Sequence, residues 1–135
     1  ATAGLDSART AMLLAVLQRR AGFNVGKLDC YLSTVGGVRL NEPAADLATV
    51  MALASAAEDK PLPRRLVVFG EVGLAGEVRA VPGIRQRINE VARLGFTHVM
   101  VPASPAGVGE VPEGVHVKEV ASVVDAVDTL FPSRS

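Results

Sequence analysis

Glycines at a regular interval are the first feature of the chain that suggests chemistry. Gly70, Gly73 and Gly76 stand three residues apart behind the apolar run 66–69. A phosphate-binding loop needs a Lys and a Ser or Thr directly after its glycines, so that the amine reaches phosphate and the hydroxyl reaches magnesium. No such Lys follows here, and the next segment has the pattern of a strand rather than the helix of a dinucleotide site. The glycines therefore predict a tight hairpin turn.

The candidate metal ligands and nucleophiles are few and scattered. Cys30, His98 and His116 lack the close spacing of a ligand set, so the sequence predicts no metal site. Both histidines fall in short predicted strands, and Cys30 falls in an apolar one, where a thiol behaves as a small hydrophobic side chain. No serine stands in the Gly-x-Ser-x-Gly context of a nucleophile elbow. These residues by themselves indicate an α/β domain without an evident active site.

Composition limits the class of the protein. At 135 residues the chain has the usual length of one domain. Hydrophobic residues make up 49% and charged residues 21%, which excludes a disordered chain. The single cysteine cannot form an internal disulfide, and the sequence shows neither a secretory leader nor a membrane-spanning run of about 18 apolar residues. A cytoplasmic location is expected.

Charge is balanced overall but unevenly placed. Basic and acidic side chains number 14 each, which argues against a histone-like coat of positive charge. Residues 1–94 hold 12 basic and 9 acidic side chains, whereas residues 95–135 hold 2 and 5, so positive charge gathers in the first part. Most of the basic residues are arginines, which favour planar pairing with phosphate or carboxylate.

Hydrophobic periodicity predicts the elements that must position these side chains. Helices are expected over 5–20, 43–58, 83–94 and 120–131. Strands are expected over 28–35, 38–40, 66–69, 77–81, 97–101 and 115–117. The strands 66–69 and 77–81 are expected to form the hairpin around the glycine turn, and Gly95 suits the left-handed position after a helix. The fold class predicted is α/β, an α+β mixed sheet with packed helices.

Three segments in order carry a family resemblance. They are Gly4-Leu5-Asp6-Ser7-Ala8-Arg9, then Val35-Gly36-Gly37-Val38-Arg39 with Ala44-Ala45-Asp46, and then Phe69-Gly70-Glu71-Val72-Gly73-Leu74-Ala75-Gly76-Glu77-Val78-Arg79. At these spacings the chain resembles the C-terminal Lon-protease-like domain of the bacterial RadA/Sms family of DNA repair and recombination proteins. The resemblance implies a Lon proteolytic-domain-like fold, ribosomal protein S5 domain 2-like. It places a linker or cloning remnant at 1–4, the domain at 5–131 and a tail at 132–135.

The resemblance also shows where a peptidase would hold its catalytic dyad. In Lon a serine attacks the peptide carbonyl, and a lysine with a depressed pKa takes its proton. The matching positions here are Ala44, which has no nucleophile, and Arg85, which stays protonated in proteins. The glycine after the serine is replaced by Asp46. A protease fold without protease activity is therefore expected, with no catalytic residues.

What such a domain does is implied by the same resemblance. RadA/Sms proteins resemble RecA and replicative helicases in their ATPase part, form hexameric rings and promote branch migration of recombination intermediates. By that resemblance this chain is a non-catalytic domain that binds duplex or branched DNA and assembles with its own copies, with a recombinase as a further partner. ATP, magnesium and zinc are expected only in ATPase and zinc-finger parts outside these residues. No cofactor and no membrane contact are expected in the domain itself.

Arginines and one lysine are the candidate DNA contacts. They are Arg9, Arg39, Lys60, Arg64, Arg65, Arg85 and Arg87. Contacts from such groups go mainly to phosphates, so binding is expected to be independent of sequence and sensitive to salt. Aromatic residues make up only 4% with no Trp, which gives little support to stacking on single-stranded bases and favours duplex DNA.

Two side-chain pairings stay open at this level. Arg9 sits early in its helix, where the dipole disfavours a cation, and is expected to reach Asp6 or a neighbouring subunit. Arg85 is hypothesised to form a buried ion pair with Asp46, because both stand near the lost dyad.

Two other functions also stay open. An assembly-only scaffold, in which the arginines pair across subunits, is close in weight to DNA binding. An active serine peptidase is the weaker alternative, because Lys27, Lys60 and Lys118 have no recognisable serine partner.

Overall fold

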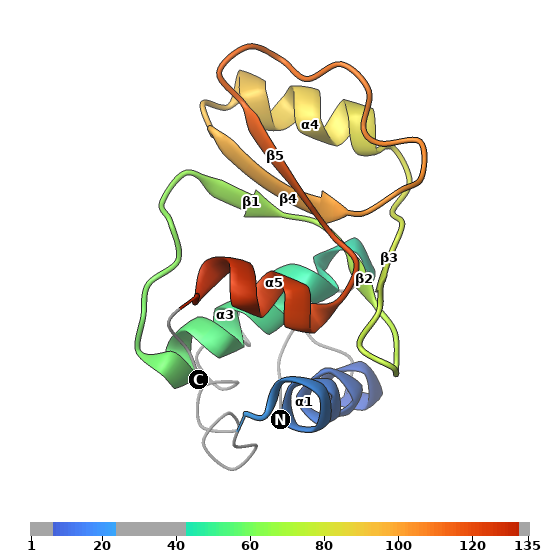
Figure 1. The fold of residues 1–135 in the computed structure, drawn as a ribbon, viewed down its shortest axis with the longest axis vertical. Helices are drawn as coiled ribbons and strands as arrows, with labels where there is room; N and C mark the ends of the chain where they lie inside the picture. The colour runs from blue at the N-terminus through green and yellow to red at the C-terminus, as the bar shows by residue number, and fades with distance from the viewer. Residues whose placement is uncertain (1–6, 24–42, 133–135) are drawn as a thin grey trace.

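The computed structural model describes residues 7–23 and 43–132 (Figure 1). The helices are α1 (Ser7–Ala21), α3 (Asp46–Glu58), α4 (Ile84–Arg93) and α5 (Val123–Leu130), and a 3-10 turn, η1 (Pro43–Ala45), leads into α3. The strands are β1 (Leu66–Val68), β2 (Glu71–Val72), β3 (Val78–Arg79), β4 (His98–Pro102) and β5 (His116–Val120). The strands predicted over 28–35 and 38–40 lie outside the described residues, as do Cys30 and Arg39.

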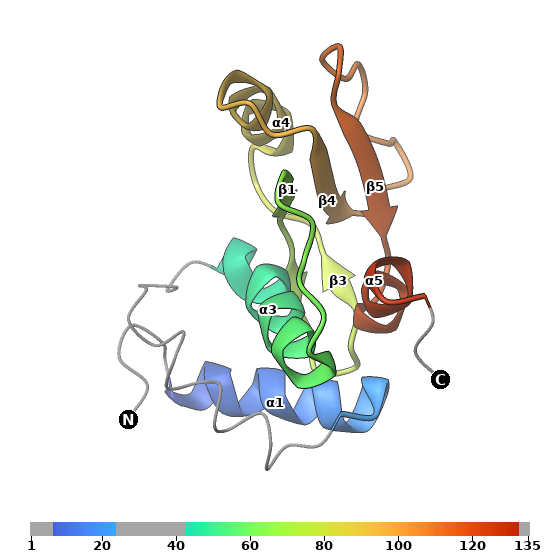
Figure 2. The same ribbon diagram turned by 90° about the vertical axis from the view of Figure 1, so that its left-hand side faces the viewer.

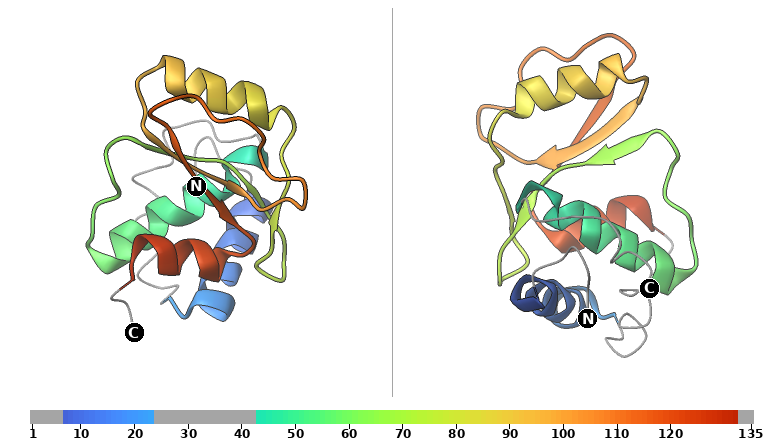
Figure 3. Two further views of the ribbon diagram at one scale, coloured as in Figure 1. Left: turned by 45° about the horizontal axis from the view of Figure 1, so that its top comes forward. Right: turned by 180° about the vertical axis from the view of Figure 1, so that it is seen from behind.

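A parallel sheet in the order β1-β4-β5 separates the helices into layers. Val67 pairs with Val99, and Val99 pairs with Val117, so one row of the sheet runs straight across the three strands. Helix α4 covers one face, and α3 and α5 lie on the other (Figures 1 and 3). Helix α1 packs beneath α3 and α5, on the side away from the sheet (Figure 2). The predicted mixed α/β fold with packed helices is confirmed.

Alternation along the strands creates two apolar cores. Val99 and Val101 of β4 pack against Ile88 and Val91 of α4. Met100, between them, points to the opposite face and joins the larger core among α1, α3 and α5. Successive strand residues point to opposite faces, so a sheet covered on both sides needs apolar residues at every position. This is why the central strand is a continuous apolar run rather than an alternating one.

Helix α3 lies at the centre of the larger core. Its side chains Leu47, Val50 and Met51 have no exposed surface. The helix is apolar on nearly all sides, as a buried helix must be, and the small alanines between these residues let α1 and α5 approach it.

The glycine hairpin forms, but from different strands than predicted. Strands β2 and β3 pair antiparallel, with Glu71 opposite Arg79, whereas β1 pairs with β4. The prediction that 66–69 pairs with 77–81 was wrong. The backbone N–H of Phe69 donates to the carbonyl of Met100 at 2.9 Å, so the end of this run is committed to the parallel sheet before the hairpin begins.

Helix α5 begins three residues later than predicted. Val120 ends β5, where it pairs with Pro102, and Ser122 caps the helix by accepting a hydrogen bond from the backbone N–H of Asp125 at 3.0 Å. The predicted strand 115–117 accordingly extends to Val120. Val120 fitted the helical stripe of the sequence because it is buried in the same core as α5, and periodicity reports burial rather than the element itself.

The end of α4 follows the sequence prediction. Gly95 has a φ of 90°, a left-handed conformation that costs a residue with a Cβ about 1–2 kcal/mol.

Among the described helices, none combines the length and the apolar character needed to cross a bilayer.

Candidate functional site

The serine position of the Lon dyad lies in a tightly packed corner. Ala44 is buried in η1, and its carbonyl accepts a hydrogen bond from the backbone N–H of Gly70 at 2.9 Å. The carbonyl of Gly70 in turn accepts from the N–H of Leu47 at 3.0 Å. A Cβ at position 70 would lie 2.9 Å from the Val78 side chain and 3.2 Å from Leu47, which explains why glycine stands there. The corner is closed by backbone contacts and contains no hydroxyl at the position of the nucleophile.

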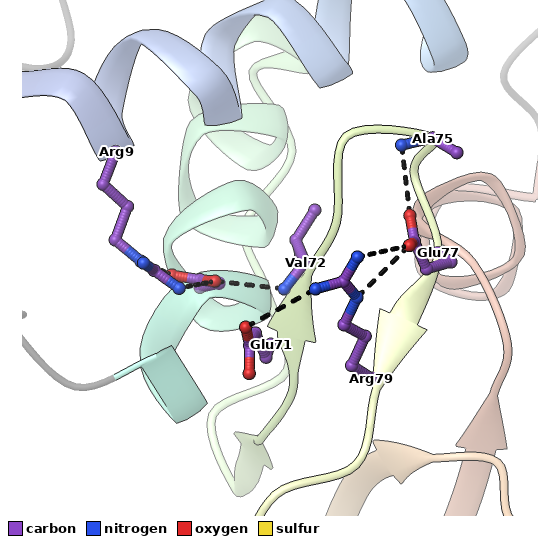
Figure 4. A network of polar contacts seen from close by, with 7 residues as sticks. Arg9, Glu71, Val72, Ala75, Glu77 and Arg79 are labelled. Carbon is purple, nitrogen blue, oxygen red and sulfur yellow. Dashed lines mark hydrogen bonds and ion pairs between the residues drawn. The ribbon is translucent and has the colours of Figure 1, made fainter.

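Asp46 anchors this corner through charge. Its carboxylate is 3% exposed and receives two hydrogen bonds of 2.6 Å from the Arg9 guanidinium, one to each oxygen (Figure 4). The backbone N–H of Val72 donates a third bond, of 3.0 Å, to Oδ2. This arrangement satisfies both oxygens with charge-assisted, bidentate geometry. It joins α1, the start of α3 and β2 at one point.

Arg85, at the lysine position of the dyad, lies elsewhere. It is exposed, and a Cβ on Gly109 would meet its Nη1 at 2.4 Å, so the guanidinium lies directly over that glycine. It borders a polar pocket of about 250 Å³ with Asn89, Glu110 and Glu113. No hydrogen bond or ion pair joins Arg85 to any described residue.

The hypothesis that Arg85 pairs with Asp46 was therefore wrong. Arg9, which is 37 residues away from Asp46 in the sequence, donates one hydrogen bond to each oxygen of the Asp46 carboxylate. The expected alternative partners of Arg9 were Asp6, which lies outside the described residues, and a neighbouring subunit. The structure places the Arg9 guanidinium on Asp46, and a contact of Arg9 with Asp6 or with a neighbouring subunit stays a prediction.

A second ionic network holds the hairpin. Arg79 donates to the Glu77 carboxylate at 2.9 Å and lies 4.0 Å from that of Glu71 (Figure 4). The other oxygen of Glu77 accepts from the backbone N–H of Ala75 at 3.1 Å. The hydrogen bond with its own backbone, and after it that from Arg79, lower the pKa of Glu77 below its usual value. Arg79 is thus used within the hairpin.

The remaining basic candidates lie on different elements. Arg64 and Lys60 are exposed in the segment before β1, and Arg64 bonds no described residue. Arg65 donates from Nη1 to the carbonyl of Gly95 at 2.8 Å, which fixes it at the carboxyl end of α4. Arg87, at the other end of α4, donates to the carbonyl of Pro82 at 3.0 Å and lies 5.4 Å from the centre of the Phe69 ring.

Arg65 thus lies at the carboxyl end of α4, Arg85 and Arg87 lie in its first turn, and Lys60 follows the end of α3. The ten residues of α4 separate its two ends by about 15 Å. The structure thus does not bring Arg64 and Arg85 together, and Arg39 lies outside the described residues.

Three side chains that had no functional role in the sequence-based prediction come together at the amino end of the parallel sheet. His98 and His116 pair directly across β4 and β5, with ring centroids 5.0 Å apart, and Lys118 follows on the same face of β5. The only sequence signal was that both histidines open predicted strands. That signal does not show that the two histidines are neighbours until the register of the strands is known. Within the described ranges, no three His, Cys, Asp or Glu side chains gather as a metal site requires.

Comparison with known families decides the classification. Residues 27–133 match the family described as Lon protease (S16) C-terminal proteolytic domain. The chain belongs to this family. The Lon proteolytic-domain-like fold inferred from the sequence is thereby confirmed, and the structure explains how a member of this family closes the serine corner without a serine.

Individual relatives point to one branch of the Lon-like proteins. The chain is 48% identical to DNA repair protein RadA of Mycolicibacterium smegmatis, over 96% of this chain and 27% of the relative. It is 46% identical to RadA of Escherichia coli K12, over 92% of this chain and 27% of the relative, and 42% identical to RadA of Streptococcus pyogenes serotype M1, over 96% and 29%. The resemblance to the C-terminal Lon-like domain of RadA is confirmed. The chain spans little more than a quarter of the length of these curated relatives.

Proposed function

We propose that this domain is the non-proteolytic Lon-like part of a RadA-type DNA repair protein, in which it contacts duplex DNA and assembles with other copies of itself. The observation that carries the proposal is the 48% identity to RadA along nearly the whole chain. In the parent protein the assembly is a hexameric ring that supports branch migration of recombination intermediates. ATP hydrolysis belongs to a different part of that protein, and a recombinase is a further partner.

Loss of peptidase chemistry is the first part of the proposal. Hydrolysis by a Ser–Lys dyad needs a hydroxyl and an amine that can be neutral. Ala44 supplies no hydroxyl, and the guanidinium of Arg85 does not lose its proton. We expect a serine-directed fluorophosphonate probe to leave the chain unlabelled. Labelling at any serine would revive the peptidase alternative.

Contact with DNA is the second part of the proposal, and the geometry reduces the number of candidate DNA-binding residues. Arg9 is bound to Asp46, and Arg65 is bound to Gly95, so neither is free to change partner without cost. Arg64 and Arg85 are exposed and make no bond to the described residues, which suits contact with phosphate. A domain of zero net charge binds DNA weakly as a single copy, and several copies in a ring raise the avidity.

A duplex titration tests DNA contact. We expect a fluorescent duplex to bind at about 50 mM salt and to lose most of its affinity at about 200 mM, because bound phosphates release counterions. Arg64→Ala should weaken binding and lower the salt slope by about one, whereas its neighbour Arg65→Ala should weaken binding less than Arg64→Ala. The matched pair separates a phosphate contact from a general loss of positive charge.

Mass measurement in solution separates DNA contact from the assembly-only scaffold. The scaffold alternative predicts oligomers that bind no duplex even at low salt. An oligomer that binds duplex in a salt-dependent manner supports the proposal, and an oligomer without DNA binding replaces it by the scaffold.

A further inference from the structure

An imidazole pair marks the amino end of the parallel sheet. His98 and His116 come from adjacent strands in direct register, and both side chains are exposed. Their ring planes are inclined by 31° at a centroid separation of 5.0 Å, within the range of offset-stacked rings. The ring nitrogen Nδ1 of His98 lies 2.9 Å from the Thr97 hydroxyl, which fixes the orientation of that ring. The pair is therefore a small, ordered aromatic surface open to solvent.

A mostly apolar pocket adjoins the two rings. Its volume is about 220 Å³, and its apolar walls come from Pro63, Leu66, Met100 and Leu130. This volume lies just below the usual range for small-molecule sites, about 300–1,000 Å³, so the pocket fits one ring system rather than two.

One cation, Lys118, lines the pocket. Arg64 stands exposed in the segment between the lining residues Pro63 and Leu66. Neither cation bonds a described residue. The arrangement joins an apolar, aromatic floor to positive charge at the rim.

No acidic side chain is among the residues that line the pocket. On β5, Glu119 lies on the opposite face and accepts from the backbone N–H of Ser104. On α5, Asp125 accepts from the N–H of Ala121 at the far end of the helix, and Asp128 is exposed but does not line the pocket. Because α5 presents its carboxyl end here, its dipole favours the Lys118 cation and disfavours an anion, so an anion depends on the Lys118 side chain.

We propose that this pocket binds one unpaired nucleotide of DNA, with its base against the His98–His116 pair and its phosphate at Lys118. The inference rests on the proposed function and extends it from duplex backbone to single-stranded ends and branch points. Histidine rings stack on nucleobases as other aromatic side chains do. An inorganic anion would make no use of the apolar walls, and an apolar peptide would make no use of the cation. A nucleotide uses both.

The experiment compares three fluorescent DNAs with the 135-residue chain. One is a blunt duplex, one carries a short single-stranded tail, and one carries the same tail built from abasic nucleotides. Base stacking contributes about 1–3 kcal/mol per base, so we expect the tailed duplex to bind about five-fold or more tightly than the blunt one. The abasic tail keeps the phosphates and should lose this preference.

Variants connect the preference to the pocket. The double variant His98→Ala with His116→Ala should bind blunt and tailed duplex equally. Its affinity for the blunt duplex should stay within about two-fold of the wild-type value, because contacts to phosphates determine duplex affinity. The double variant His98→Phe with His116→Phe keeps two rings and should keep the preference. Arg19→Ala removes an exposed charge from α1, the layer away from the sheet, and should also keep it.

The outcomes distinguish this inference from the proposed function. Duplex binding without a tail preference, a preference that persists with the abasic tail, or one that survives removal of both rings overturns the pocket and leaves the proposed function intact. Absence of all DNA binding overturns the proposed function. Titration with free deoxyadenosine monophosphate then decides the pocket. Shifted histidine ring signals in the NMR spectrum would assign it to free nucleotides instead of DNA, and unchanged signals would end the inference.

Discussion

At the scale of single residues, the contact between Arg9 and Asp46 explains how the packed corner around Ala44, where Lon has its serine, stays closed. The guanidinium is 27% exposed and the carboxylate 3%, so the two partners depend on the pair to different degrees. Arg9 can turn to water if its partner is neutralised. Asp46 cannot, and would keep only the Val72 N–H as a donor. A buried charge without its counter-charge is among the most costly defects in a protein interior.

The first prediction follows from this asymmetry. Arg9→Met should lower the free energy of unfolding by about 3 kcal/mol, the low end for breaking a buried pair. Asp46→Asn, which keeps an acceptor for Val72, should cost at least about 1 kcal/mol less. Urea unfolding measures both. The exposed pair Arg93–Glu90 supplies the control, since Arg93→Met should cost far less stability than Arg9→Met. Equal losses for the two Arg9–Asp46 variants would contradict the asymmetry.

At the scale of elements, the β2–β3 hairpin and the start of α5 stabilise each other. The N–H of Val78 donates to the carbonyl of Ala121 at 2.9 Å, and the N–H of Val123 donates to that of Gly76 at 2.8 Å. Glu77 and Ser122 form a β-bridge between these two bonds. The hairpin is thus attached to α5 by backbone bonds, although the two are separated in sequence by α4 and two strands.

Removal of the cap of α5 is the second prediction. Ser122→Ala deletes the hydroxyl that accepts from the N–H of Asp125 and should cost about 1 kcal/mol of stability. Ser104→Ala, in the exposed loop after β4, should change stability by less than about 0.5 kcal/mol. Thermal unfolding of both variants checks the difference, and equal losses would show that the cap bond is unimportant.

Acid response of the hairpin is the third prediction. Hydrogen bonds with its own backbone and with Arg79 lower the pKa of Glu77. A carboxylate with a lowered pKa adds stability above its ordinary pKa of 4.5, and that stability is lost as the pH falls through the lowered value. Glu77→Gln should therefore be less stable than the wild type at pH 7, with the difference shrinking below pH 4.5. Urea unfolding at several pH values measures it. A gap that stays constant with pH would argue against the titration.

At the scale of the whole molecule, the layered packing sets where charge can act. Arg85 lies in the first turn of α4, whereas Arg64 precedes Arg65, whose guanidinium is bound at the Gly95 end of that helix. A duplex bound by one copy would meet Arg64 and Arg85 at separate points, and copies in an assembly would present each end repeatedly.

Additivity is the fourth prediction. Sites more than about 7–10 Å apart without shared partners contribute independently. The double variant Arg64→Ala with Arg85→Ala should lose the product of the two single fold-changes in duplex affinity, and its salt slope should fall by about two. Fluorescence titration against salt measures both. A double variant no worse than either single variant would show that the two arginines act as one site.

The sequence by itself determined the chemistry that is missing and the elements that are present. Residue type alone removes the hydroxyl at Ala44 and the neutral amine at Arg85. Apolar spacing alone predicted four helices close to their observed bounds, because burial on one face leaves a local, periodic record. The prediction was wrong in two places: the element that contains Val120, and the strand that pairs with residues 66–69. In both places the same burial pattern is compatible with two different elements.

Tertiary structure decided which distant side chains meet. The hypothesised partner of Asp46 was Arg85, but α1 lies across the start of α3 and brings Arg9 there instead. His98 and His116 are unremarkable in sequence and become neighbours only through the parallel register of β4 and β5. Parallel pairing joins strands across a long connection, and nothing in the local pattern of either strand specifies its register. The packing around Ala44 and the pocket beside His98 and His116 therefore depend on the tertiary structure. The local sequence around each of these residues does not specify them.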